Sequence, residues 1–334
     1  MVTIQGGKVM TDEYGRKIDY LRLSLTDKCN LRCIYCIPSD AEEIPHFDKI
    51  LSMDQIFDIC SAMSDLGIRK LKLTGGEPLV RSGISEFIAK VKNETKIQNV
   101  TLTTNGILLK KHLDDLSKAG LDAINISLDT LDTTTYKELT GFDKLGSVLD
   151  SIDYACETNI PSIKINCVPL GKINEDDLVP IAKMAKDKNI HVRFIELMPI
   201  GFGKKFESVS TKDVMNKIQN ELGILIPFDG QLGNGPARYY KIDGFKGKIG
   251  FISALSNKFC SGCNRIRLTS SGFLKTCLHF NKGIDLLPYL KNGNSDELKN
   301  SILKAVSDKP LHHSFGDKDN KENVDDNNMV SIGG

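Results

Sequence analysis

Leu21-Arg-Leu-Ser-Leu-Thr-Asp-Lys-Cys29-Asn-Leu-Arg-Cys33-Ile-Tyr-Cys36 is a strand-like run of alternating leucines followed at once by three cysteines. The cysteines are spaced Cys-x3-Cys-x2-Cys. Three thiolates this close together can hold three corners of a cubane iron–sulfur cluster, and they leave the fourth iron open to a small molecule. A zinc knuckle and a disulfide pair are the alternatives. Zinc sites usually have four protein ligands, and this run contains neither a histidine nor a fourth cysteine.

The composition is that of a globular protein with no strong charge preference. The 334 residues are 40% hydrophobic and 26% charged, which is enough for one large domain or a barrel with an appendage. The net charge of +1 gives no global field toward nucleic acid or a membrane. The N-terminal residues show no targeting pattern, and there is no apolar run of eighteen residues. We therefore expect a soluble, cytoplasmic protein that binds neither nucleic acid nor membrane.

The nine cysteines divide into two kinds. Six lie in two tight groups, a pattern typical of metal binding in a reducing compartment and not of a disulfide framework. The other three are scattered through periodic segments, and we expect them to be small buried hydrophobic residues: Cys60, Cys156 and Cys167.

Strand-like runs alternate with amphipathic stretches of helical length. The runs are Leu21–Leu25, Lys70–Thr74, Val100–Thr104, Ala123–Leu128, Ser162–Val168 and His191–Ile195. A capping box at Ser52 begins the first helix, which Gly67 ends, and further helices are expected over 108–118, 145–158 and 175–188. Such alternation predicts an α/β fold with a parallel sheet, and six units make an incomplete (β/α)6 version of the eight-unit TIM barrel.

The pattern changes after Pro199. Residues 1–200 are predicted to form the partial barrel with the first cysteine group. A helix near 211–222 and short strands follow, which predicts a smaller C-terminal α+β region over 201–316 that closes the open side of the barrel. Residues 317–334 are predicted to be a flexible tail, because 317–328 are almost all charged or amide residues.

The two faces of the predicted strands differ in polarity. Because alternate residues point to opposite sides of a strand, one face is apolar and should pack on the helices. The other is polar and carries five cations from four strands: Arg22, Lys70, Lys72, Lys164 and Arg193. Converging cations need carboxylate partners, for which Glu77 and Asp129 are available, or a multiply charged anion. Their number favours a phosphate-rich ligand, which side chains would hold because the sequence contains no P-loop.

A second cysteine group lies near the C-terminal end. Cys260-Ser-Gly-Cys263 and Cys277 have the spacing C-x2-C-x13-C. His279 follows closely, so a Cys3His zinc site is an alternative. Arg265 and Arg267 lie on one face of the strand after Cys263, and cations beside three thiolates favour a second open cluster that binds an anionic substrate.

These motifs resemble the radical S-adenosylmethionine (SAM) superfamily and, over nearly the whole chain, its GTP 3′,8-cyclase family, which begins molybdenum cofactor biosynthesis. The superfamily features are the Cys-x3-Cys-x-Tyr-Cys run and the turn Gly75-Gly76-Glu77 one strand later. The other matching segments are Asp12–Arg16, Thr103–Gly106, Asn125–Asp129, Cys260–Arg267, Cys277 and Met329–Gly334. The last two cysteine motifs and the Gly-Gly end distinguish the family from the rest of the superfamily.

The resemblance implies two [4Fe–4S] clusters and SAM as cofactors. The implied cluster ligands are Cys29, Cys33, Cys36, Cys260, Cys263 and Cys277, and the implied SAM contacts are Tyr35, Gly76, Ser127 and Met198. The implied GTP contacts are Arg22, Lys72, Thr103, Lys164, Arg265, Ile266 and Arg267, to which the polar strand face adds Arg193. Arg265, Arg267, Gly333 and Gly334 are expected to act in catalysis, the glycines through a tail that enters the site. Many relatives have arginine where Lys72 stands, which keeps the charge but not the bidentate geometry.

The implied reaction converts GTP to (8S)-3′,8-cyclo-7,8-dihydroguanosine 5′-triphosphate. In this family an electron from the first cluster cleaves SAM, the resulting radical removes the ribose 3′-hydrogen, and C3′ joins C8 of a guanine held at the second cluster. The implied partners are an electron donor such as a flavodoxin or ferredoxin and the downstream cyclic pyranopterin monophosphate synthase, and a homodimer is a further expectation.

Two other functions fit part of the pattern. A twin-cluster radical SAM enzyme acting on a peptide shares the first motif but does not need a cationic interior. An iron–sulfur electron carrier or redox sensor has no need of the Gly-Gly-Glu turn.

Overall fold

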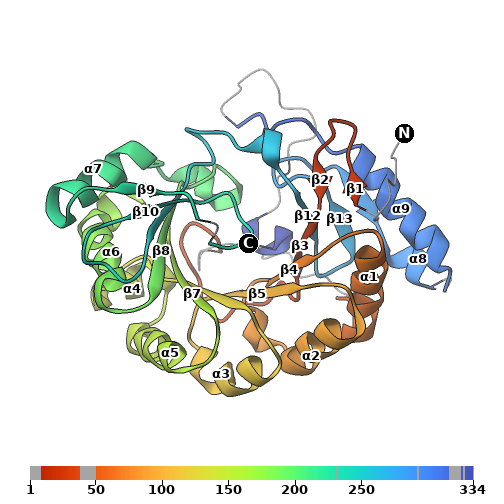
Figure 1. The fold of residues 1–334 in the computed structure, drawn as a ribbon, viewed down its shortest axis with the longest axis horizontal. Helices are drawn as coiled ribbons and strands as arrows, with labels where there is room; N and C mark the ends of the chain where they lie inside the picture. Colours follow the sequence, from red (N-terminus) through yellow and green to blue (C-terminus); the bar gives the residue numbers. More distant parts are fainter. Residues whose placement is uncertain are drawn as a thin grey trace.

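The computed structural model describes residues 9–37, 50–230, 232–291, 293–315, 325 and 328–333, and a curled, open sheet of twelve strands dominates it (Figure 1). Six parallel strands form its centre: β3 (Tyr20–Ser24), β4 (Lys70–Thr74), β5 (Asn99–Thr104), β6 (Ala123–Ser127), β7 (Ser162–Cys167) and β8 (Ile190–Ile195). Each predicted strand is confirmed to within one residue at either end. The predicted incomplete TIM-type barrel is therefore confirmed.

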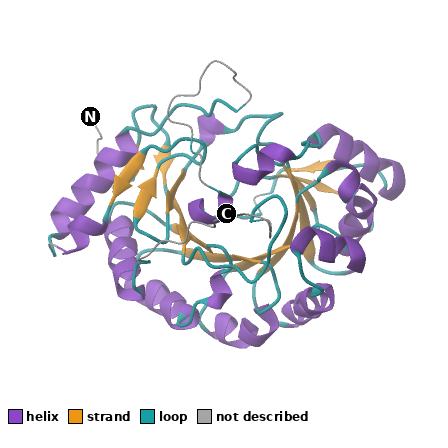
Figure 2. Cartoon of the chain, turned by 180° about the vertical axis from the view of Figure 1, so that it is seen from behind, coloured by secondary structure: helices purple, strands orange, loops and turns teal. Residues whose placement is uncertain are grey.

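Helices cover the convex side of the sheet, as seen from both directions (Figures 1 and 2). They are α1 (Met53–Asp65), α2 (Ile84–Glu94), α3 (Leu109–Lys118), α4 (Thr133–Thr140), α5 (Leu145–Glu157) and α6 (Leu178–Asp187). The capping box of α1 is present, with the Ser52 hydroxyl accepting from the Gln55 N–H at 3.1 Å and the Gln55 side chain accepting from the Ser52 N–H at 2.9 Å. The sequence analysis missed α2 and α4. Gly83 gives α2 no side-chain cap, and the threonine-rich start of α4 has low helix propensity.

The C-terminal region extends the sheet at both ends. Its helices are α7 (Thr211–Leu222), α8 (Leu287–Lys291), α9 (Ser295–Ser307) and α10 (Met329–Ile332). Its strands are β9 (Ile226–Phe228), β10 (Arg238–Lys241), β11 (Ile249–Ile252), β12 (Arg265–Leu268), β13 (Phe273–Lys275) and β14 (Gly283–Asp285). β11 pairs in parallel with β8, and β12 pairs in parallel with β3. The central sheet thus has eight parallel strands, two of which come from the C-terminal region predicted to close the open side of the barrel.

This connectivity places the two cysteine groups at opposite ends of the parallel strands. The first group follows β3 and therefore lies at the carboxyl ends of the parallel strands. The chain leaves β11 at the same end, passes the open side of the sheet through residues 253–264, and enters β12 at the amino end. Cys260 and Cys263 lie directly before β12, and Cys277 follows the antiparallel β13, so all three lie toward the amino ends.

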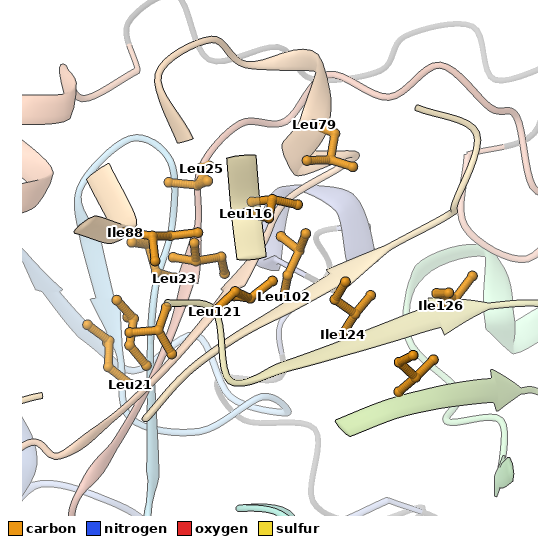
Figure 3. Close-up of a cluster of buried hydrophobic side chains, with 14 of the residues drawn as sticks. Leu21, Leu23, Leu25, Leu79, Ile88, Leu102, Leu116, Leu121, Ile124 and Ile126 are labelled. Atoms are coloured by element: carbon orange, nitrogen blue, oxygen red, sulfur yellow. The ribbon is translucent and has the colours of Figure 1, made fainter. Parts of the chain in front are cut away.

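The apolar strand face packs against the helices, as predicted. Leu21, Leu23, Leu102, Ile124 and Ile126 are completely buried in one large hydrophobic core (Figure 3). Complete burial of such a side chain contributes about 1.5–3 kcal/mol relative to leaving it exposed. This layer fixes the orientation of each strand, and the intervening residues consequently point into the curl.

A hairpin of β1 (Met10–Thr11) and β2 (Lys17–Ile18) precedes the barrel. Cys60 and Cys167 are buried as expected, but the prediction for Cys156 was wrong, because that residue lies on an exposed face of α5. No helix in the described part of the chain is long and apolar enough to cross a membrane.

Candidate active site

The inner face of the curled sheet surrounds a cavity of about 700 Å³. Residues of the polar strand face line it, which confirms the prediction from alternation: Arg22, Lys72, Thr101, Thr103, Asn125, Ser127, Lys164, Asn166 and Arg193. The pairing register explains their grouping, since Arg22 lies opposite Lys72 and Arg267, and Asn125 lies opposite Thr103 and Lys164. Side chains at the same height on neighbouring strands therefore converge.

Lys70 is the exception among the five predicted cations. It belongs to the polar parity, but its ammonium pairs with the Asp19 carboxylate at 2.8 Å and does not line the cavity. Lys70 is the first residue of β4, and Asp19 directly precedes the neighbouring strand β3, so the two residues lie side by side at the amino ends of these strands. Alternation gives the face of a strand residue but not how far along the strand the cavity extends.

The carboxylates that might have neutralised the remaining cations are held by other donors. Glu77 accepts from the Thr104 hydroxyl at 2.8 Å and from the Asn105 N–H at 2.7 Å. Asp129 accepts from the Tyr35 hydroxyl at 2.6 Å and from the Val168 N–H at 2.8 Å. No ion pair among the described residues joins either carboxylate to a cation of the cavity. An external anion remains the better explanation of the cationic face.

The electrostatics of the inner face favour such an anion. Burial and the neighbouring Arg193 lower the pKa of Lys164 to about 7. Burial, Arg193, Arg22 and Lys164 lower the pKa of Lys72 well below its ordinary value. Both shifts come from burial and from neighbouring positive charges, and a bound anion would offset the cost of those charges. Arg193 is held in place by Asn166, which accepts from its Nε at 2.9 Å.

The first cysteine loop is fixed by backbone contacts at the carboxyl end of the cavity. Arg32 N–H donates to the Thr140 carbonyl at 2.8 Å, and Ile34 N–H donates to the Leu139 carbonyl at 3.0 Å. Cys29, Cys33 and Cys36 are partly exposed free thiols that line the cavity. Burial, the Cys36 thiol, the Asp129 carboxylate and the Cys29 thiol raise the pKa of Cys33 well above its ordinary value, and burial raises the pKa of Cys36 to about 12.

The Gly75-Gly76 turn is required by close packing under this loop. A Cβ on Gly76 would lie 2.3 Å from the Lys28 carbonyl oxygen, and one on Gly75 would lie 2.6 Å from that of Thr26. The Gly76 N–H donates to the Thr26 carbonyl at 2.7 Å, and the Glu77 N–H donates to that of Lys28 at 2.8 Å. Only glycine allows the two loops this approach.

The other residues expected to contact SAM lie at the same end of the cavity. Tyr35, Gly76, Ser127 and Met198 all line it. They come from four separate segments, since Ser127 ends β6 and Met198 follows β8. The hydroxyl of Tyr35 is already used to bind Asp129.

The second cysteine group lines the opposite end of the same cavity. Cys260 and Cys263 frame a short 3-10 turn, and Arg265 Nη2 lies 3.9 Å from the Cys263 sulfur. Burial by itself would raise the pKa of Cys263, but Lys309 and Arg265 lower it to about 7. A thiol with a lowered pKa is ready to act as a thiolate ligand.

The zinc alternative for this group is not supported. His279 is 6% exposed, and its Nε2 lies 2.9 Å from the Ser314 hydroxyl. Its ring packs between Phe280 and Phe315, at centroid distances of 4.6 and 4.2 Å. Within the described residues no three side chains of His, Cys, Asp or Glu are arranged to hold a single metal ion.

Arg265 and Arg267 point to one side of β12, and Ile266 points to the other. Arg265 and Arg267 line the cavity. Ile266 is completely buried in the hydrophobic core, so the contact expected between this residue and the substrate would have to come from its backbone. The family segment was assigned as a whole, whereas strand alternation already separates Ile266 from its neighbours.

The end of the chain enters the cavity, as predicted. Figures 1 and 2 show the last described residues inside the curl of the sheet. Met329 and Val330 of α10 line the cavity, and the Gly333 carbonyl accepts from Arg267 Nη1 at 3.0 Å and from the Thr74 hydroxyl at 3.2 Å. Gly333 has a φ of +82°, and a Cβ there would lie 2.7 Å from the Ser24 Cβ. Gly333 is therefore a position that only glycine fills without strain.

The predicted tail, residues 317–334, is described only in part. Gly334 and most of 317–328 lie outside the described residues. Within that span Asp325 is 3% exposed, its N–H donates to the His279 carbonyl at 2.9 Å, and its carboxylate pairs with Lys275.

Several site residues were missed by the sequence analysis. Lys309 lines the cavity beside the second cysteine group, and so does the loop Leu232–Pro236 at the amino ends of the strands. Neither belongs to a periodic segment or a cysteine motif, so alternation and spacing gave no signal for them.

Comparisons with known proteins agree with this arrangement. The model of the Radical SAM superfamily matches residues 23–185, and that of Molybdenum Cofactor Synthesis C matches residues 190–315. The chain is 47% identical to the GTP 3′,8-cyclase of Clostridium perfringens (strain 13 / Type A), covering 97% of this chain and 100% of that one. It is 42% identical to the GTP 3′,8-cyclase of Desulforamulus reducens, covering 92% of this chain and 96% of that one.

Solved structures share the fold at low sequence identity. Streptococcus suis SuiB bound to S-adenosylmethionine has a TM-score of 0.64 at 16% identity, covering 91% of this chain and 67% of that one. A hexahistidine-tagged anSMEcpe with bound AdoMet has a TM-score of 0.58 at 14% identity, covering 89% of this chain and 79% of that one.

Proposed function

The chain belongs to the GTP 3′,8-cyclase family of the radical SAM superfamily, and on that premise we propose that it converts GTP to (8S)-3′,8-cyclo-7,8-dihydroguanosine 5′-triphosphate, the first step of molybdenum cofactor biosynthesis. The observation that carries the proposal is the convergence of two cysteine groups and a cationic sheet face on one cavity. Each feature serves a different part of the reaction. Each region of the cavity would therefore bind a different ligand.

The carboxyl end fits a SAM-binding [4Fe–4S] cluster. Cys29, Cys33 and Cys36 supply three thiols on a loop held by Leu139 and Thr140, and the glycine turn beneath leaves space where a Cβ would collide. Three thiols leave one iron of a cubane cluster open, which is where SAM would bind. When bound, the reduced cluster and SAM supply a carbon-centred radical that removes the ribose 3′-hydrogen. The chain's part is to place Tyr35 and the segments carrying Gly76, Ser127 and Met198 around the cofactor.

The middle of the cavity fits a triphosphate. Arg22, Lys72, Lys164 and Arg193 converge there with Thr103, and the carboxylates nearby are held by other donors. Hydrogen bonds to a charged group typically contribute about 1.5–3 kcal/mol each. Fixing the triphosphate at several points orients the ribose toward the carboxyl end, and such alignment can contribute about 7–11 kcal/mol of the barrier.

The amino end fits a second cluster beside the guanine base. Cys260, Cys263 and Cys277 line this end of the cavity and supply three thiols, the number that leaves one iron of a cubane cluster open. Arg265 and Arg267 follow Cys263 on β12, and Arg267 pairs with Arg22 of the proposed triphosphate region. The docked Gly333 carbonyl ties Arg267 to Thr74 and hence the tail to the site.

A peptide-modifying function is less well supported. One solved structure is of SuiB bound to the precursor peptide SuiA, but at 16% identity the likeness concerns the fold alone. The relatives that share 42–47% identity are GTP 3′,8-cyclases. A peptide substrate also would not account for the cluster of cations on the inner face of the sheet.

We extend the proposal to location and partners. The chain would work in a reducing cytoplasm, where open clusters survive, with an electron donor such as a flavodoxin or ferredoxin. Its product would pass to a cyclic pyranopterin monophosphate synthase, and a homodimer is the proposed assembly. Size-exclusion chromatography with light scattering would test the assembly, and anaerobic reduction by purified flavodoxin would test the donor.

The experiment that tests the function is anaerobic incubation of the reconstituted protein with SAM, dithionite and each nucleoside triphosphate in turn. We expect 5′-deoxyadenosine and a cyclised guanosine product when the nucleotide is GTP, and no cyclised product with any other nucleoside triphosphate. Equal 5′-deoxyadenosine formation with every nucleotide and no cyclised product would contradict the proposal.

A further inference from the structure

A buried lysine joins the two arms of the second cysteine group. Lys309 follows α9 and is 3% exposed. Its ammonium donates to the backbone carbonyl of Arg265 at 2.9 Å and to that of Thr276. Arg265 comes two residues after Cys263, and Thr276 directly precedes Cys277. One side chain therefore connects both strands that present the thiols.

Arg16 fixes the segment that carries this lysine. Its Nε pairs with the buried Asp12 carboxylate at 2.6 Å. Its other donors reach four backbone carbonyls, those of Cys260, Lys309, Pro310 and Leu311, at 3.0, 3.3, 2.8 and 2.8 Å. The planar guanidinium suits such a multiple contact. All three cysteine segments are thus tied to a core of two buried cations.

The two cations differ in how their charge is compensated. Asp12 neutralises Arg16. Lys309 is bound by carbonyl oxygens, and no ion pair among the described residues neutralises it. A positive charge therefore remains beside the second cysteine group, at the wall of the cavity that Lys309 and the three cysteines line together. Net charge and hydrogen bonding around a cluster are what set its reduction potential.

We propose that Lys309 is a positioning residue for the second cluster. Its side chain holds the segments that carry Cys263 and Cys277 at the spacing a cluster needs, and its positive charge raises the reduction potential of that cluster. Reduction adds one electron and makes the cluster more negative, so a fixed positive charge stabilises the reduced form. The inference rests on the proposed function, since it takes a cluster at these cysteines as given. It explains why a lysine is buried where a neutral residue would avoid the cost of desolvation.

The test uses three substitutions at Lys309 and one control in the full-length, anaerobically reconstituted protein. Lys309→Gln removes the charge and keeps a donor, Lys309→Met removes both, and Lys309→Arg keeps the charge. Lys282→Met is the control, because it removes an exposed lysine from the hairpin that carries Cys277. Iron per chain is counted, and the midpoint potential of each cluster is measured by redox titration with electron paramagnetic resonance. SAM-dependent signal changes identify the first cluster.

We expect Lys309→Gln to shift the potential of the second cluster to more negative values while the first cluster is unchanged. Lys309→Met should lose about four of about eight irons, and Lys309→Arg and Lys282→Met should resemble the unaltered protein. A second cluster with an unshifted potential in Lys309→Gln would overturn this inference alone. Lys309→Met with full iron and an unshifted potential would do the same. Only four irons in the unaltered protein would overturn the proposed function together with this inference.

Discussion

Replacing Gly333 by alanine should undock the tail without harming either cysteine group. The new Cβ would lie 2.7 Å from the Ser24 Cβ, and the backbone φ of +82° lies in the region that alanine avoids. The displaced carbonyl would lose its bonds from Arg267 and Thr74. The side chains of α10 would remain unchanged, so the variant tests the docking of the tail end itself.

The size of the effect follows from two contributions. The left-handed conformation costs alanine about 1–2 kcal/mol. Loss of the hydrogen bond from the charged Arg267 costs about 1.5–3 kcal/mol. Since about 1.4 kcal/mol corresponds to a factor of ten, the equilibrium constant for docking should fall by roughly two to three and a half orders of magnitude.

The assay compares product with cofactor cleavage in anaerobically reconstituted protein. Cyclised guanosine product should fall by about the same factor as the docked population, while iron content and 5′-deoxyadenosine formation stay near those of the unaltered protein. Gly244→Ala is the matched control, because Gly244 has a φ of +74° with no atom within 4 Å of a Cβ. It carries the same backbone strain in an exposed turn that does not line the cavity, and it should leave product formation unchanged. Normal cyclisation by Gly333→Ala would refute the view that the docked tail is part of the active site.

Three further predictions follow from the site. Cys277→Ala should lower iron from about eight to about four per chain and leave the SAM-dependent signal of the first cluster intact, as measured by iron analysis and electron paramagnetic resonance. Lys164→Ala should weaken GTP binding by about 10- to 150-fold in calorimetry, from about 1.5–3 kcal/mol, and leave SAM binding unchanged, whereas the control Lys70→Ala, outside the cavity, should change neither. Because the pKa of Lys164 falls to about 7 on folding, the unfolded chain binds more protons than the folded one between pH 7 and about 10. The ligand-free protein should therefore gain stability as the pH rises through this window, by up to about 1.4 kcal/mol per pH unit for this group, and denaturant titrations of Lys164→Met should show a smaller gain.

The sequence predicted the central strands and their two faces because both depend on local alternation. The face of Arg22, Lys72, Lys164 and Arg193 follows from their position relative to the leucines and isoleucines beside them. Alternation could not show that Lys70 lies beyond the cavity, since that depends on the register with Asp19 on the neighbouring chain segment.

The C-terminal part of the sheet was harder to predict. β11 and β12 have four residues each and join opposite ends of the central sheet, so no local pattern indicates their partners. The contact of Lys309 with two backbone carbonyls depends on three segments meeting in space. A lysine bound in this way looks, in the sequence, like any solvent-exposed lysine.

GTP labelled with deuterium at C3′ tests the proposed reaction at its first step. The proposed function places the ribose between the SAM site and the triphosphate contacts, so hydrogen removal from C3′ should precede ring closure. We predict one deuterium in the 5′-deoxyadenosine formed under anaerobic single-turnover conditions, together with a cyclised guanosine product that has lost it. Unlabelled 5′-deoxyadenosine, or labelled 5′-deoxyadenosine without cyclised product, would contradict the account.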